Sequence, residues 1–358
     1  MKVLSPYYIT IPFIAPNSGL VCAQFTLNIF VWSGLKSAVP IAPTYEITKE
    51  NPTASSGSTK IDVSRLVADF IDFDFVGTGQ NEVLNSENQV WVKTSTVYYT
   101  TNPADLTTET NVFIDLAKKG YNTGFSSENF DTTSGILIDT SIDYKIYNSF
   151  VVPVIARQTL STNYSVISYP NNEINISGTI APTTNSNEII KNIWVKIDSN
   201  STEEYIEVKY SGRTVTLVKE NECRYFPNSV VFQNQEGALS LITFFKKRVD
   251  SLDITSEEYE SNNGQPIDGF HQYTNFNIQG REKFTLSSGF VEEELNSAFT
   301  QLLLSERVWL FIPLFGSGYI KFPINVESKS IEYKTRQNDR LINYTINFKY
   351  AYNKINNI

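Results

Sequence analysis

Few side chains in this sequence are suited to acid–base or metal chemistry. His271, in the stretch DGFHQYTNF, is its single histidine, and Cys22 and Cys223 are its two cysteines. A Ser-His-Asp triad or a multi-histidine metal site would depend on that one imidazole, and no G-x-S-x-G segment accompanies it. The cysteines lack the paired spacing of a structural zinc site. We therefore interpret His271 as a packed or exposed strand residue and the two cysteines as buried thiols.

Carboxylates are the other candidates for chemistry. Asp72 and Asp74, in DFDF, would share one face of an extended chain, but no further ligands follow at the spacing of a calcium loop. Glu292, Glu293 and Glu294 begin a predicted helix, where they suit its positive end. Two acids distant in the chain could still serve glycoside hydrolysis, so a glycosidase or lyase stays open as a minor alternative. Otherwise the sequence predicts no catalytic, cofactor-binding or metal-binding residue, and hence no enzymatic activity.

Composition favours a folded β protein. Of the 358 residues, 41% are hydrophobic, 19% are charged and 13% are aromatic, with 20 Tyr and 23 Phe. Tyr and Phe suit the pleated, half-buried surface of a sheet. The formal net charge of −9 argues against sequence-specific binding of nucleic acid, which needs an electropositive surface.

No segment predicts a membrane span or an export signal. The sequence has no stretch of the ~20 apolar residues that a membrane helix needs. Pro6, Pro12 and Pro16 interrupt the N-terminal stretch that could otherwise pass for a signal peptide. We expect a soluble protein that is made in a cytoplasm.

Alternation of apolar and polar residues predicts strands along most of the chain. In residues 339–353, DRLINYTINFKYAYN, apolar side chains fall at every second position from Ile342 to Tyr352. Ser211-Gly212 predicts a tight turn between two strands. The other predicted strands are at 21–32, 43–50, 88–101, 144–156, 189–197, 204–210, 213–220, 228–234, 239–247, 270–278, 281–288, 307–314 and 318–327.

Two helices are predicted among these strands. The first lies near 62–71, where Asp62 or Ser64 can cap it. The second lies near 290–305, where Ser288 can cap it. Its apolar stripe comprises Val291, Leu295, Ala298, Phe299, Leu302 and Leu303. Both helices are short, so each must pack on a sheet to be stable.

We predict a mainly β fold of two β-sandwich-like domains of antiparallel strands, each with one helix packed on its sheet. The domains are expected at 1–156 and 190–358. Residues 157–189 are rich in Ser, Thr, Asn and Pro and contain two short predicted strands, YSVISY (164–169) and EINISG (173–178). This stretch is either a linker or an arm that becomes ordered on a neighbouring molecule by adding a strand to its sheet.

The abundant aromatic residues have three possible uses. They could form the core, anchor a permanent contact between subunits, or stack on sugars. We expect the four tryptophans to lie in the core: Trp32, Trp91, Trp194 and Trp309. Long strands, loop tips and an orderable arm favour repeated subunits over a compact sugar-binding module, because head-to-tail contacts among identical copies close into rings.

Several segments form a distinctive set. In the first half these are KIDVSRLVADFI (60–71) and GYNTGF (120–125). In the second half they are the strand pattern of 223–247, the segment SSGFVEEELNSAFTQLLLSERVWL (287–310), and the closing segment 327–353. Together these segments resemble virion proteins of tailed phages that infect Bacteroidota, the crAss-like group among them. The resemblance covers most of the chain apart from 157–189.

The resemblance implies a non-enzymatic structural protein, with no catalytic or cofactor-binding residues to transfer. It would be a subunit of a homo-oligomeric ring in the tail, collar or head–tail connector, assembled in the bacterial cytoplasm. Its partners would be further copies of itself and other tail or connector proteins, the portal among them. A receptor- or glycan-binding module at a tail tip or cell surface is the alternative.

Overall fold

The chain folds mainly into strands, as its alternating sequence predicts. The computed structural model describes residues 7–15, 19–33, 37–51, 56–71, 80–85, 89–99, 113–114, 118–121, 135–157, 161–181, 188–197, 201–222, 224–260, 271–313, 318–328 and 341–354. Within these residues the strands form five sheets, joined by two α-helices and one short 3₁₀ helix. The expected mainly β fold is therefore confirmed.

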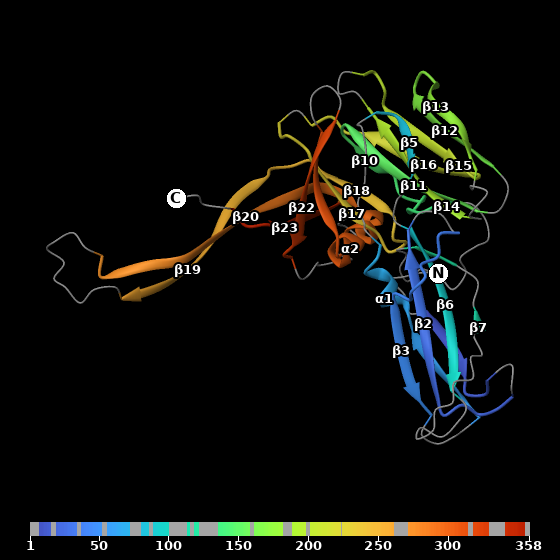
Figure 1. Ribbon diagram of the computed structural model, residues 1–358. Helices are drawn as coiled ribbons and strands as arrows, with labels where there is room; N and C mark the ends of the chain where they lie inside the picture. The colour runs from blue at the N-terminus through green and yellow to red at the C-terminus, as the bar shows by residue number, and fades with distance from the viewer. Residues whose placement is uncertain are drawn as a thin grey trace.

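The N-terminal part is built on one five-stranded sheet, drawn in blue and cyan in Figure 1. Its strands are β2 (Gln24–Trp32), β3 (Tyr45–Glu50), β6 (Gln89–Tyr99), β7 (Phe113–Ile114) and β8 (Lys118–Tyr121). A separate two-stranded sheet pairs β1 (Tyr8–Pro12) with β4 (Ser58–Asp62). The predicted first helix is confirmed as α1 (Ser64–Ala68). The N-cap is Val63, which makes no side-chain cap bond, so neither of the predicted caps, Asp62 or Ser64, holds that position. The Asp62 carboxylate accepts hydrogen bonds from the backbone N–H (3.0 Å) and the hydroxyl (2.6 Å) of Ser64 at the start of the helix.

Two further sheets follow. The four-stranded sheet orders β5 (Glu82–Asn85), β14 (Glu188–Lys196), β11 (Ser149–Arg157) and β9 (Gly135–Ile136). The five-stranded sheet orders β10 (Tyr144–Ile146), β16 (Arg213–Lys219), β15 (Tyr205–Tyr210), β12 (Thr162–Tyr169) and β13 (Glu173–Ile180). β10 and β16 run parallel, whereas the other pairs are antiparallel. The turn predicted between β15 and β16 is confirmed, with Ser211 at φ 51° and Gly212 at φ 75°.

The largest sheet has seven strands. In spatial order they are β18 (Leu239–Phe244), β17 (Asn228–Gln233), β21 (Val308–Pro313), β22 (Tyr319–Val326), β23 (Leu341–Tyr350), β20 (Tyr273–Glu292) and β19 (Val249–Glu260). The closing strand predicted from its alternation is confirmed as β23, with buried Tyr344, Ile346, Phe348 and Tyr350.

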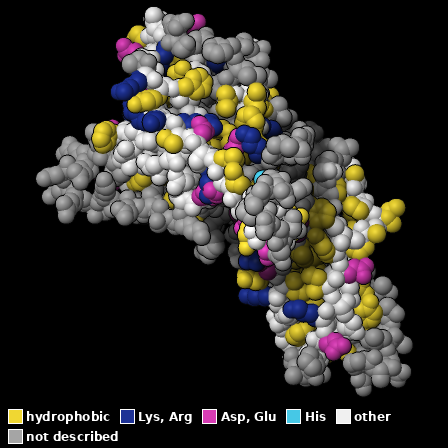
Figure 2. Space-filling view, turned by 90° about the vertical axis from the view of Figure 1, so that its left-hand side faces the viewer, with side chains coloured by type: hydrophobic (Ala, Val, Ile, Leu, Met, Phe, Trp, Pro, Cys, Tyr) yellow, Lys and Arg dark blue, Asp and Glu magenta, His cyan; other side chains and the backbone are white. Residues whose placement is uncertain are grey.

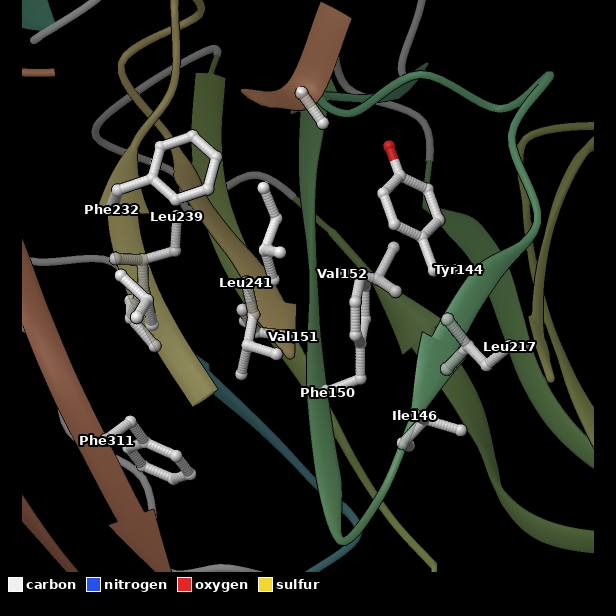
Figure 3. Packing of buried hydrophobic residues seen from close by; sticks show 14 of the residues in the cluster. Tyr144, Ile146, Phe150, Val151, Val152, Leu217, Phe232, Leu239, Leu241 and Phe311 are labelled. Atoms are coloured by element: carbon white, nitrogen blue, oxygen red, sulfur yellow. The ribbon is translucent and has the colours of Figure 1, made fainter. Parts of the chain in front are cut away.

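The five-stranded sheet of β10 to β16 and the seven-stranded sheet pack as layers on the two sides of the four-stranded sheet (Figure 3). Figure 3 shows Val151 of β11 on the side of Leu241, and Phe150 on the side of Leu217 and Tyr144. The rings of Tyr144 and Phe150 lie 5.1 Å apart. On the other side, the rings of Trp194 and Phe311 stack at 5.6 Å. β11 is therefore covered on both faces, which explains its continuous apolar run from Phe150 to Ala156.

The hydrophobic cores divide the chain elsewhere than at the predicted boundary near residue 156. One large core draws on residues from Ile11 to Tyr98, the other large core runs from Ile136 to Tyr350, and a small separate cluster joins Leu137, Ile155, Ile190 and Ala238. β11 pairs with β14 along its whole length, from Ser149 opposite Lys196 to Arg157 opposite Glu188. The expected boundary at 156/157 therefore falls at the end of a strand inside one sheet, and its two flanks share one core.

Residues 157–189 are neither linker nor detached arm over their described part. β12 and β13 form an antiparallel hairpin, and β12 also pairs with β15 from Tyr164 to Tyr169. Val166 and Ile180 are buried in the larger core. The apolar residues embedded in this Ser- and Thr-rich stretch are thus sufficient to build it into the chain's own sheet.

The second predicted helix begins later than residue 290. β20 continues to Glu292, followed by η2 (Glu293–Leu295) and α2 (Asn296–Leu304). Ser288 is not its cap, because the Ser288 hydroxyl accepts a hydrogen bond from the Tyr344 N–H at 2.9 Å within the sheet. Val291, the first residue of the predicted apolar stripe, therefore lies in a strand. The later residues of the stripe pack on the sheet as expected: the ring of Phe299 lies 6.0 Å from that of Phe244 and 4.6 Å from that of Tyr344.

The expected core positions of the tryptophans are largely confirmed. Trp32, Trp91 and Trp194 are buried, and Trp309 is partly buried against the larger core. Cys22 is buried as predicted, and burial raises the pKa of its thiol. Cys223 lies outside the described residues.

Candidate interaction surface

The residues considered for chemistry are not brought together. His271 is exposed immediately before β20, and Glu292, Glu293 and Glu294 are exposed at its other end. Asp72 and Asp74 lie outside the described residues. Within the described ranges, no group of three or more His, Cys, Asp or Glu side chains could hold a metal ion.

The feature that stands out is a long hairpin, formed by β19 and the first half of β20, that projects from the seven-stranded sheet (Figure 1). All twelve residues of β19 are exposed. β20 is exposed in its first half and buried in its second, where it enters the core beside β23. We call residues 254–260 and 271–280 the distal arm, and residues 248–253 and 281–284 its root.

Arg248 anchors the first strand at the root. Its guanidinium lies 4.5 Å from the ring centroid of Phe284 and donates hydrogen bonds to Asp250 (2.7 Å) and to the Tyr350 hydroxyl (3.2 Å). It also donates to the side-chain oxygen of Asn228 at 3.3 Å, in β17. Charge-assisted bonds and a cation–π contact therefore tie the start of β19 to two strands of the core.

Asp253 ends the anchored part of the root. Its carboxylate lies 2.5 Å from the ammonium of Lys283 and 3.4 Å from that of Lys349. Both lysines also approach Glu327, at 3.0 Å and 3.8 Å. The hydrogen bond from Lys283, aided by Lys349, holds the pKa of Asp253 below its usual value, so this carboxylate stays ionised at neutral pH.

From Leu252 outward, no described element covers the core-facing side of the hairpin. Leu252 and Ile254 stand opposite Glu282 and Gly280, on the same side of the hairpin as buried Phe284. Ile278 falls on this side as well, and Leu252, Ile254 and Ile278 are between 47% and 62% exposed. The apolar face that builds the core thus extends into solvent along the arm.

The opposite side of the distal arm carries an aromatic pair. The rings of Tyr259 and Phe276 meet edge to face at 5.4 Å across the two strands. Glu257 lies on this side, whereas Glu258 and Glu260 alternate to the side of Ile254, and the described distal arm contains no Lys or Arg. Figure 2 views the face from which the arm projects and shows hydrophobic side chains exposed among charged ones.

The arm has the physical properties of a surface that binds another molecule. An isolated two-stranded hairpin is marginally stable in water, and clustered exposed apolar side chains mark protein-binding sites. The root ties this hairpin to the body, and the exposed distal arm lies where a second molecule can reach both of its faces. The arrangement can bury apolar surface on assembly.

A second, smaller surface lies on the outer face of β12 and β15. The rings of Tyr169 and Tyr205 stack with centroids 4.5 Å apart and an angle of 8° between planes. The Tyr169 hydroxyl donates to the Glu207 carboxylate at 2.9 Å, and Lys209 pairs with Glu207 at 2.8 Å. These four half-buried side chains form a polar aromatic platform on a flat sheet.

Sequence reasoning found the second strand of the arm but not the first. Residues 249–260, VDSLDITSEEYE, alternate weakly and carry five acids, so they were not predicted as a strand. The signal that could have located them is the turn-forming stretch SNNGQPIDG (261–269), which lies between them and the predicted strand at 270–278.

Comparison with known proteins adds no relative from which a role could be taken. No family model matches the chain, and no curated protein sequence matches it either. Among the described helices, none is long and apolar enough to cross a membrane.

Proposed function

We propose that this chain is a non-enzymatic structural protein of a phage virion. It is a subunit of a homo-oligomeric ring in the tail, collar or head–tail connector, acts by packing against its neighbours, and assembles in the bacterial cytoplasm. The resemblance of residues 223–247, 287–310 and 327–353 to phage virion proteins supports the virion assignment. Further copies of the chain and other tail or connector proteins, the portal among them, are the proposed partners.

One observation carries the assembly role: all twelve residues of β19 are exposed, although the strand belongs to the same sheet as the buried strand β17. The distal residues 254–260 of this strand cover no described core, so they do not stabilise a monomer by burial. A subunit gains a contact surface, because a neighbour can bury Leu252, Ile254 and Ile278 on binding.

The experiment compares the purified chain with a variant whose arm is shortened. Ile254 and Gly280 stand directly opposite each other on the two strands. Residues 255–279 can therefore be replaced by Asn-Gly, which forms a two-residue turn between antiparallel strands. Native mass spectrometry should show a closed oligomer for the natural chain and monomer for the shortened one. Both cores should remain intact, with unchanged thermal unfolding of the body.

Replacing Ser211-Gly212 by Asn-Gly is the matched control, since it alters another exposed hairpin turn and should leave the oligomer unchanged. A natural chain that stays monomeric at every concentration and binds neither portal nor tail extracts would overturn the proposed function. An oligomer that survives the arm replacement would refute the role of the arm.

A receptor- or glycan-binding module is the second candidate, favoured by the Tyr169–Tyr205 platform. Paired aromatic rings beside a carboxylate can stack on a sugar and bond to its hydroxyls. Binding on a glycan array that falls at least tenfold in Tyr205→Ala would support this function. A natural chain that binds no glycan would exclude it.

A further inference from the structure

The free edges of the sheets identify a receiving site for the arm. An edge strand exposes unpaired backbone N–H and C=O groups, and proteins protect such edges by shortness, charge, proline or cover. All but two of the described edge strands are protected in one of these ways. β18 is mostly buried, and five strands have four residues or fewer: β5, β7, β8, β9 and β10. β1 carries Pro12, β3 carries the charged residues Glu46, Lys49 and Glu50, and β4 carries Lys60.

Two long edges remain, β13 and β19. β13 has eight residues, Glu173–Ile180, with its one charged residue at its first position and a bulge at Asn175. It pairs with β12, and no described strand pairs with its other side. Ile174 is 60% exposed on it. A neutral, open edge with an exposed isoleucine is a site for adding a strand.

β19 is the other long edge, and its charge determines what it can pair with. It carries Asp250, Asp253, Glu257, Glu258 and Glu260 and no Lys or Arg. Two copies of β19 side by side would bring acids against acids, which destabilises a strand pair. A neutral edge such as β13 imposes no such repulsion.

We propose that the distal arm of one copy adds β19 to the free edge of β13 in the next copy. This inference rests on the proposed function and names the two surfaces in contact. The seven distal residues 254–260 match the eight residues of β13 in length. Ile254 of the arm and Ile174 of β13 are exposed apolar residues that such pairing would bury.

The positions of the two edges show how one copy after another could be added to the assembly. Figure 1 shows the arm and β13 at opposite ends of the molecule. Each copy therefore offers one donor edge and one acceptor edge, which is a head-to-tail contact. Repetition of that contact closes a ring when the rotation per copy permits. Such pairing also covers the long edges that would otherwise promote aggregation.

Cysteine cross-linking tests the contact directly. Thr255→Cys and Ser177→Cys place exposed thiols on β19 and β13, in a Cys223→Ser background in which Cys22 is buried. When the two variants are mixed and treated with a short bis-maleimide, a cross-linked dimer should form. Thr48→Cys, exposed on the β3 edge, replaces Ser177→Cys in the control mixture and should give none.

A charge substitution gives an independent readout that leaves the fold intact. Ile174→Lys adds a charge to the open edge and should convert the oligomer to monomer. Ile41→Lys makes the same change at a fully exposed isoleucine away from both edges and should leave it unchanged. Circular dichroism of both variants should match that of the natural chain.

The outcomes separate this inference from the proposed function. An oligomer that forms without the Thr255–Ser177 cross-link and survives Ile174→Lys refutes the β19–β13 contact but leaves assembly standing. Cross-links between two Thr255→Cys chains alone would show that arms pair with each other, which also refutes it. A natural chain that is monomeric overturns both.

Discussion

β17 and β19 lie in one sheet, yet every residue of β17 is buried and every residue of β19 is exposed. β17 is hydrogen-bonded between β18 and β21, and other layers cover both of its faces. β19 is an edge strand that extends past those layers. The difference shows that the sheet extends farther than the core it supports, and the uncovered end is where another molecule can bind.

Within the hairpin, the root marks the change from residues bound to the body to residues exposed to solvent. Arg248, Asp253 and Lys283 hold the root to the body through ion pairs and hydrogen bonds. The distal arm has an aromatic pair between its own strands and no described ion pair to the body. The root therefore contributes to the stability of the subunit, and the distal arm to assembly.

The largest expected difference is between two phenylalanine substitutions, one in the buried strand β17 and one in the distal arm. Phe232→Ala in β17 removes a fully buried ring and should lower the free energy of unfolding by about 3–5 kcal/mol. Phe276→Ala in the distal arm removes a ring that is 44% exposed and should cost under ~1 kcal/mol. Urea denaturation of the isolated subunit measures both. Equal losses would show that the arm belongs to the core.

Arg248→Ala should have an intermediate effect. It removes the bonds to Asp250, Asn228 and Tyr350 and the contact with Phe284, so the cost should be ~1–3 kcal/mol. Hydrogen exchange should accelerate in residues 249–253. Arg224→Ala, whose guanidinium lies 5.3 Å from the exposed side of Tyr225, is the control and should change stability by under ~0.5 kcal/mol. Slow exchange retained in β19 of Arg248→Ala would refute the anchoring role.

The smallest effect concerns pH. Because Lys283 lowers the pKa of Asp253 in the folded state, the stabilisation is present above the unfolded pKa and is lost as pH falls through the folded one. Asp253→Asn should therefore flatten the acid side of the stability profile measured by denaturation between about pH 2 and pH 6. High salt should reduce the difference, since the carboxylate is solvent-accessible. Identical profiles for both proteins would contradict the ion-pair network.

Local patterns in the sequence predicted local structure well. The alternation of β23, the Ser211-Gly212 turn and the Asp62-Ser64 start of α1 follow from contacts close in the chain. Positions that depend on distant partners were missed. Ser288 resembles a helix cap until Tyr344 pairs with it. Two strands are predicted within residues 157–189, but only the pairing of β12 with β15 shows that they belong to the chain's own sheet.

The candidate site was the least predictable part. Alternation in residues 249–260 can show that a strand has two faces but cannot show whether another layer covers either of them. That depends on how far the strand extends beyond β17, β18 and α2, and only the packed structure reveals it. The acidic residues of β19 indicate which strands it can pair with only once β19 is known to be an edge strand.

A cryo-EM map of the purified assembly tests the central claim most directly. It should show the distal arm of each copy lying against the next copy, with Leu252, Ile254 and Ile278 covered. An assembly whose arms project freely into solvent, with its contacts made by other faces, would contradict the account.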